Sequence, residues 1–232
     1  MLETTIPEHA PPARSTAAST AFAAIRRDIL SGVLAPGRKL RIDGLCKAYG
    51  ATINPLREAL NRLTSEGLVT QEDQRGFSVA PISLEDWRDV VRARCLMEGC
   101  ALGEAIRRRD EAWEERVVVA LHWLSRTQHW SADEKTANPE WGPRHNAFHD
   151  ALLSACGSQI MLAYCRELRE RADRYRHIAS TNFKRRDSLD EHRAIADAAM
   201  AGDTELAVAR LTQHYMTTFA VIERYFGRMP AA

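Results

Sequence analysis

Four histidines in the C-terminal half of the chain have the residue type and spacing of metal ligands. His145 and His149 are four residues apart, so on a helix they would project from one face, a single turn apart. Two imidazoles at this separation can share one metal ion. His192 and His214 each lie within a later segment of helical apolar periodicity. Because helix bundles build metal centres from side chains on facing helices, we expect the four histidines to hold one divalent metal ion.

Other interpretations of these histidines remain open. A single histidine on an apolar helix face is more often a core residue with satisfied hydrogen bonds. An open histidine site can also activate water, as in a metal-dependent hydrolase. Against an enzyme, His145 and His149 enclose only Asn-Ala-Phe, without the carboxylate that a zincin motif places there as general base. A purely structural metal would instead need a closed site with four protein ligands.

The segments that carry the histidines are expected to be helices. Residues 83–86, Ser-Leu-Glu-Asp, form a capping box, and the apolar residues after it recur at helical spacing. We expect the following residues to form the buried side of this helix: Trp87, Val90, Val91, Ala93, Leu96, Met97, Cys100 and Ala101. Further helices are expected over residues 110–128, 138–155 and 159–176, after a cap at 187–190, and from Gly202-Asp203 to Tyr225. Since no strand pattern appears after residue 80, this half is predicted to be an all-α bundle of about six helices.

The N-terminal half shows a different pattern, in which a short helix is followed by a hairpin. Thr52 can cap a helix with Pro55 in its first turn and an inward side formed by Leu56, Ala59, Leu60 and Leu63. Strands over 68–70 and 77–79 would follow, joined by a polar turn. Upstream we expect a helix capped by Ser19 or Thr20, a Pro36-Gly37 turn, a short extended piece and a helix over 42–49. This order is that of a winged helix-turn-helix, which projects one helix at the width of a DNA major groove.

The length and composition predict two domains. With 232 residues, of which 45% are hydrophobic and 27% charged, the chain is long enough for two domains of ordinary size. We divide it into a flexible tail over residues 1–18, a winged helix-turn-helix domain over 19–80, a linker over 81–83 and an all-α domain over 84–228. The expected fold class is therefore mainly α.

The same composition predicts a cytoplasmic protein with no membrane partner. No apolar run approaches the roughly 20 residues that span a bilayer. The N-terminus lacks the basic start and apolar core of a signal peptide. The five cysteines are odd in number and scattered, which fits buried thiols in a reducing compartment.

Three short motifs in the N-terminal half carry a resemblance to a known family. They are Pro-Leu-Arg-Glu-Ala-Leu at residues 55–60, Glu-Gly-Leu-Val at 66–69 and Arg-Gly-Phe at 75–77. This half resembles the DNA-binding domain of the GntR family of bacterial transcription regulators. Together with the basic residues, the resemblance implies the following candidates for DNA contact: Arg41, Thr52, Ile53, Asn54, Arg57, Arg75 and Gly76. Arg41 could equally be a surface charge. Many relatives have arginine where this chain has Ile53, which removes a possible bidentate contact with guanine.

A second resemblance covers residues 83–224. Phe148-His149-Asp150-Ala151-Leu152, Glu191-His192 and His214-Tyr215 are similar to motifs of the FCD domain, the all-helical effector domain of the FadR-type GntR subfamily. That domain commonly holds a divalent metal through an acidic residue or asparagine and three histidines, and His145 stands at the acidic position here. The resemblance thus implies His145, His149, His192 and His214 as ligands. Such a nitrogen-rich site favours zinc or nickel over magnesium or calcium.

The FCD resemblance also implies a binding site for a small carboxylic acid. Arg94 precedes Glu98 by four residues, matches the Arg-x3-Glu pattern of the family, and would bind a carboxylate with its planar guanidinium. The alternative is a surface ion pair between Arg94 and Glu98. Arg174, Arg176 and Tyr215 are the other ligand-binding candidates. Trp113-Glu114 and the run at 174–176 are similar to the carbon-starvation-induced regulator branch, which suggests a short dicarboxylate or hydroxy acid.

The resemblances imply a homodimeric transcription regulator and not an enzyme. We expect it to be a repressor that binds a pseudo-palindromic operator in double-stranded DNA and responds to a small carboxylic acid. Two alternatives remain, a metal-dependent hydrolase and a constitutive DNA binder whose metal is purely structural.

Overall fold

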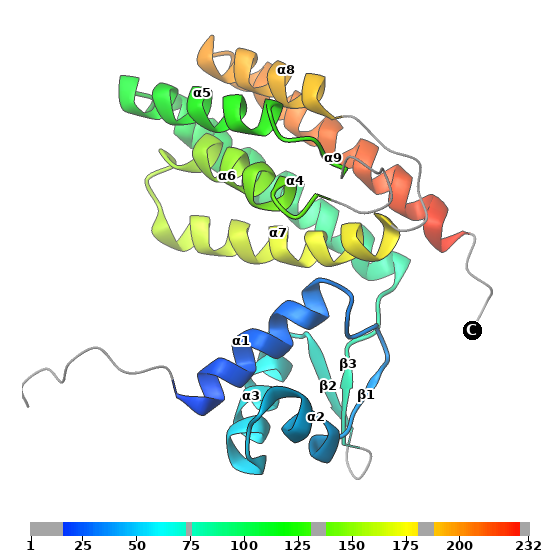
Figure 1. The fold of residues 1–232 in the computed structure, drawn as a ribbon. Coiled ribbons are helices and arrows are strands. Elements are labelled where there is room, and N and C mark those ends of the chain that lie inside the picture. The colour runs from blue at the N-terminus through cyan, green and yellow to red at the C-terminus, as the bar shows by residue number, and fades with distance from the viewer. Residues whose placement is uncertain (1–15, 73–75, 131–137, 181–187, 228–232) are drawn as a thin grey trace, which may run out of the picture. The chain divides into compact units, whose positions relative to one another are not determined.

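The computed structural model describes residues 16–72, 76–130, 138–180 and 188–227. The chain divides into two compact units, Met1–Pro81 and Ile82–Ala232. Over these described residues the structure has the mainly α fold class expected from the sequence, with a small sheet in the first unit and a helical bundle in the second (Figure 1).

The first unit combines three helices with a three-stranded antiparallel sheet. The helices are α1 (Ala17–Leu30), α2 (Ile42–Tyr49) and α3 (Ile53–Ser65). The strands are β1 (Lys39–Leu40), β2 (Val69–Glu72) and β3 (Gly76–Val79), with β3 in the centre of the sheet. Val69 pairs with Val79 and Glu72 with Gly76, so β2 and β3 form the predicted hairpin. This is the winged helix-turn-helix that the sequence predicts.

Helix α1 begins earlier than the sequence analysis placed it. Thr16, and not Ser19 or Thr20, is the N-cap, and its side chain accepts a hydrogen bond from the Ser19 amide at 3.1 Å. Ala17 and Ala18 are therefore helical, and the prediction that the tail extends to residue 18 is wrong at these two positions. Ala18 is buried, which gives a physical reason for the extra half turn.

The core of this unit holds α3 in a fixed orientation. Ile25 and Ile29 of α1 pack with Leu56, Leu60 and Leu63 of α3, and all five side chains are completely buried. The inward face of α3 is therefore confirmed. Because α1 covers this face, the opposite face of α3 is left to solvent.

The second unit is an all-α bundle over its described residues, as predicted. Its helices are α4 (Leu84–Arg107), α5 (Glu111–Ser125), α6 (Trp141–Leu153), α7 (Gln159–Ser180), α8 (Leu189–Met200) and α9 (Thr204–Phe226). Helix α4 packs against α6, α7 and α9, while α5 packs against α6 and α8 (Figure 1). Trp87, Trp113 and Phe148 are the largest side chains buried in its core. None of the helices described is long and apolar enough to cross a membrane.

Two expected core positions of α4 face solvent instead. Leu96 is 66% exposed and Cys100 is also exposed, so the predictions that they are buried are wrong. Both lie one turn apart on the side of α4 that its neighbouring helices leave uncovered. The apolar pattern of α4 is thus wider than the surface that the bundle buries.

Candidate functional site

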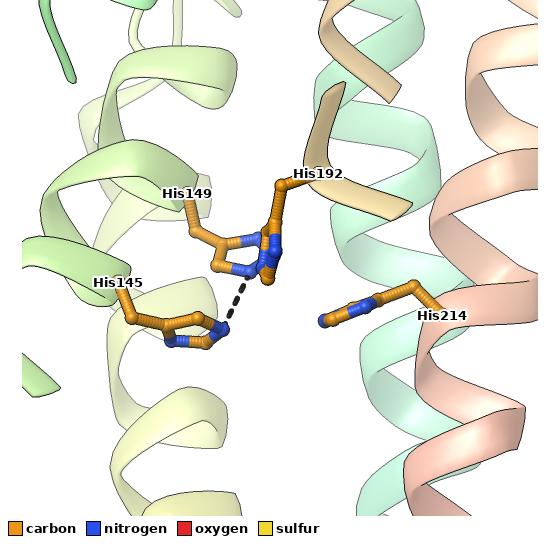
Figure 2. Close-up of side chains that lie close together, drawn as sticks. All are labelled: His145, His149, His192 and His214. Carbon is orange, nitrogen blue, oxygen red and sulfur yellow. Dashed lines mark hydrogen bonds between the residues drawn. The ribbon is translucent and has the colours of Figure 1, made fainter. Parts of the chain in front are cut away.

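The structure brings the four predicted histidines together in the second unit. His145 and His149 project from α6, His192 from α8 and His214 from α9 (Figure 2). One ring nitrogen from each lies within 4.8 Å of the others, and the Nε2 atoms of His145 and His149 are 3.2 Å apart. All four side chains are buried. Helices α6, α8 and α9 therefore bring the four imidazoles together at one site.

Two of the imidazoles are oriented by acceptors outside the cluster. The Nδ1 atom of His192 lies 2.7 Å from the carbonyl oxygen of Ser188, and the Nδ1 atom of His214 lies 2.8 Å from a carboxylate oxygen of Glu191. Because both oxygens accept, each Nδ1 carries a proton, and in the neutral form of each ring Nε2 presents a lone pair. Metal-binding histidines are commonly held in this way.

His192 leaves one polar atom without a partner. Its Nε2 is buried and has no hydrogen-bond partner among the described residues. Burying an acceptor without a hydrogen-bond donor costs free energy. A metal ion bound to this nitrogen would remove that cost.

The electrostatic environment keeps His145, His149 and His192 neutral. Burial lowers the pKa of His145 and His149 well below the usual value, and the nearby Arg176 guanidinium lowers that of His145 further. Burial and the neighbouring His214 lower the pKa of His192 to about 3. Neutral imidazole is the form that binds metals.

The donor set fits a late first-row divalent ion. Nitrogen ligands about 2.1 Å from zinc lie roughly 3.4 Å apart in a tetrahedral site. The separation of the His145 and His149 Nε2 atoms is close to this value. Four neutral nitrogen donors suit zinc, nickel or copper better than calcium or magnesium.

Arg94, the expected carboxylate clamp, is already paired within the bundle. Its Nε donates to Glu98 at 2.6 Å, and both side chains are buried, so the alternative of a surface ion pair is wrong. The Tyr215 hydroxyl donates to the other oxygen of Glu98 at 2.6 Å, and the Arg94 guanidinium lies 4.0 Å from the centre of the Tyr215 ring. Burial and Glu98 raise the pKa of Tyr215 well above its usual value, so the hydroxyl keeps its proton.

This network reaches the histidine cluster through Tyr215. The Tyr215 oxygen lies 3.4 Å from Nδ1 of His149, which makes it the nearest acceptor for the outer nitrogen of that ring. Arg94 therefore reaches the cluster by contact through Tyr215, and its charge also helps to lower the pKa of His149.

Arg176 stands directly beside the cluster. One of its terminal nitrogens lies 3.3 Å from both ring nitrogens of His145, and Asp173 binds the other. The Arg176 side chain is 21% exposed. Arg174, in contrast, has Asp86 and Tyr175 as its electrostatic neighbours near the start of α4.

Trp141 and Glu191 are site residues that the sequence analysis missed. The Trp141 ring stacks on His145 with 4.6 Å between ring centres, and the Arg176 guanidinium lies 5.8 Å from the centre of the Trp141 ring. The spacing 141, 145, 149 was a signal that could have identified Trp141. No sequence signal links Glu191 to His214, because that contact joins two helices.

The first unit exposes the predicted DNA-contacting residues of α3. Thr52 is the N-cap of α3 but its side chain makes no capping hydrogen bond, and Ile53, Asn54 and Arg57 are exposed. Arg41, the N-cap of α2, is exposed as well. Gly76 has φ of 79°, a conformation that favours glycine. Arg75 lies outside the described residues.

A winged helix-turn-helix with a separate helical bundle defines a DNA-binding transcription regulator. Family comparison agrees, since residues 17–79 match the model described as bacterial regulatory proteins, gntR family, and residues 89–217 match the FCD domain. The chain belongs to the GntR family of bacterial regulators and carries an FCD domain.

Similar proteins share this architecture. The HTH-type transcriptional repressor GlaR of Escherichia coli K12 is 35% identical over 86% of this chain and 93% of its own length. BphR of Paraburkholderia xenovorans LB400, an uncharacterized HTH-type transcriptional regulator, is 36% identical over 89% of this chain and 84% of its own. A crystal structure of a GntR-type putative regulator from Rhodococcus sp. RHA1 has a TM-score of 0.70 at 25% identity, over 92% of this chain and 99% of that one. All three carry the names of transcriptional regulators.

Proposed function

We propose that this chain is a homodimeric repressor whose binding to a pseudo-palindromic operator is controlled by a small carboxylic acid. The acid would bind beside a divalent metal ion in the four-histidine cluster. The convergence of four buried imidazoles, with a partnerless Nε2 on His192, is the observation that carries this proposal. The name of the related repressor GlaR supports the direction of regulation.

His145, His149, His192 and His214 would hold the metal, with zinc or nickel preferred. When bound, the metal supplies a Lewis acid that accepts a carboxylate oxygen. Ser188 and Glu191 accept hydrogen bonds from Nδ1 of His192 and His214, so Nε2 of each ring would be the atom that binds the metal.

Arg176 is the better candidate for the carboxylate clamp. Arg94 donates to both oxygens of Glu98, so a carboxylate would have to displace a buried ion pair to reach it. Arg176 lies next to His145 and is partly exposed, with one terminal nitrogen beside the cluster. An acid held there would contact both the guanidinium and the metal. Trp141, in the first turn of α6, would form one wall of the same site.

The site is placed to act on the packing of the bundle. Its ligands come from α6, α8 and α9, while Arg176 comes from α7. A ligand that contacts four helices can favour one arrangement of these helices over another. It shifts the equilibrium between the two arrangements by the difference in its affinity for them. Such a shift would change the spacing of two recognition helices in a dimer.

Homodimerisation has a candidate surface on α4 and α7, which pack against each other. Large apolar side chains are exposed on both helices, namely Leu96 of α4, 66% exposed, and Ile160 and Tyr164 of α7, 73% and 55% exposed. Large exposed apolar groups on adjacent helices mark interaction sites more often than free surface. In a twofold dimer the same face of each protomer meets its copy, which would bury all three side chains.

Thermal unfolding tests the sensing function. Zinc or nickel should raise the Tm of the parent chain, and this shift should be lost or strongly reduced in His149→Ala and His192→Ala. A panel of short carboxylic acids should then include one that raises the Tm further, but only of metal-loaded protein. Arg176→Ala should keep the metal shift and lose the acid shift, while the matched control Arg171→Ala, also on α7, should keep both.

Two results would contradict the proposal. A metal shift that persists unchanged in both histidine variants would place the metal elsewhere. Failure of every acid to shift the metal-loaded chain would favour a constitutive DNA binder with a structural metal.

A further inference from the structure

Ile53 is exposed where the fold gives it no partner. It is the first residue of α3 and is 50% exposed, whereas Leu56, Ala59, Leu60 and Leu63 of the same helix are completely buried. An apolar side chain that stays in contact with water contributes little hydrophobic stabilisation to the fold. The side chain is therefore available for a contact outside the chain.

The position of Ile53 on α3 defines what it can contact. Ile53 and Arg57 are four residues apart, so they share one helix face, and Asn54 beside them is exposed too. In helix-turn-helix proteins the N-terminal residues of the recognition helix reach the base edges in the major groove. Ile53 is thus a base-contacting position in a chain that belongs to a DNA-binding family.

The chemistry of isoleucine selects one kind of base edge. Its side chain has no donor or acceptor, so it cannot form the bidentate contact with guanine that arginine makes. The C5 methyl group of thymine is the apolar group that the major groove displays, and apolar side chains read it by contact. We propose that Ile53 reads one thymine in each operator half-site through its methyl group. The proposal concerns operator specificity; its two half-sites rest on the proposed homodimer, but it does not depend on the metal or the acid.

Replacing thymine by deoxyuridine tests this contact, because it removes the methyl group and leaves every hydrogen-bonding group of the base. An operator is first selected from random DNA with the full-length chain. Each thymine is then replaced singly by deoxyuridine, and Kd is measured for the parent chain and for Ile53→Ala. At one position per half-site, replacing thymine by deoxyuridine should weaken operator binding by the parent chain about fourfold. This is the factor expected for loss of one buried methyl-sized group.

For the Ile53→Ala variant, operators with thymine or with deoxyuridine at that position should have the same Kd. Because Ile53 is exposed and alanine favours helix, this variant should fold, which circular dichroism checks. Val33→Ala, an exposed apolar residue of the same unit, is the matched control and should keep the discrimination. The proposal is overturned if no thymine shows a methyl effect, or if the effect persists in Ile53→Ala.

Discussion

The Nδ1 atom of His214 lies 2.8 Å from a carboxylate oxygen of Glu191, so an imidazole of α9 and a carboxylate of α8 meet at the edge of the histidine cluster. The contact places a proton on Nδ1 of His214 and would make its Nε2 a stronger donor to a metal. Histidines that bind metals commonly have an outer partner of this kind.

Glu191→Gln should weaken metal binding by about 10- to 100-fold, the range found when outer partners of ligating histidines are changed. Titration of zinc against a chelator of known affinity measures this. Asp190→Asn is the matched control, because Asp190 is exposed and pairs only with Arg193 among the contacts described. Equal zinc affinity in all three proteins would show that Glu191 does not act on a metal ligand.

Glu98→Ala should destabilise the bundle by about 3–5 kcal/mol, since it leaves the buried Arg94 charge without its counter-ion. Urea unfolding followed by circular dichroism gives the free energy of unfolding. Glu104→Ala on the same helix should change it little, because Glu104 forms exposed pairs with Arg107 and Arg108. A stable Glu98→Ala protein would mean that Arg94 finds another partner or water.

Leu96→Asp combined with Tyr164→Asp should produce monomers if α4 and α7 form the dimer face. Light scattering after gel filtration reports the mass. Val118→Asp is the control, since Val118 is a half-exposed apolar residue of α5. A double variant that stays dimeric would assign dimerisation to another surface.

Arg57→Ala should weaken operator binding by about 1–3 kcal/mol if its guanidinium contacts a base. Measuring Kd over a range of salt concentrations separates the two possible roles. A base contact changes the preferred sequence, while a phosphate contact weakens all sequences alike and lowers the salt slope by about one. Unchanged affinity would remove Arg57 from the DNA surface.

The sequence predicted most of the fold because its helices are strongly periodic. The inward face of α3, the wing hairpin and the six helices of the second unit all follow from local patterns. Periodicity could not show that Leu96 and Cys100 face outward, because it separates apolar from polar faces but does not say which apolar positions a neighbour covers.

The candidate site was predictable in part for a similar reason. Spacing grouped His145 with His149, and helical periodicity in a bundle, supported by family motifs, added His192 and His214; the structure places all four within reach of one another. The pairing of Arg94 with Glu98 follows from spacing, but its burial depends on Tyr215 of α9. Glu191 contributes through a contact between two helices, which no single segment encodes, whereas the spacing of Trp141 and His145 on α6 was a usable signal.

His145 determines the net charge of the proposed centre. A divalent ion bound by four neutral imidazoles keeps both of its positive charges, whereas an acidic ligand at position 145 would cancel one. The Arg176 guanidinium beside His145 is paired with Asp173, and the Arg94 guanidinium is paired with Glu98, so the charge of the ion itself sets the sign of the local field. Such a centre attracts a dianion more strongly than a monoanion of the same size.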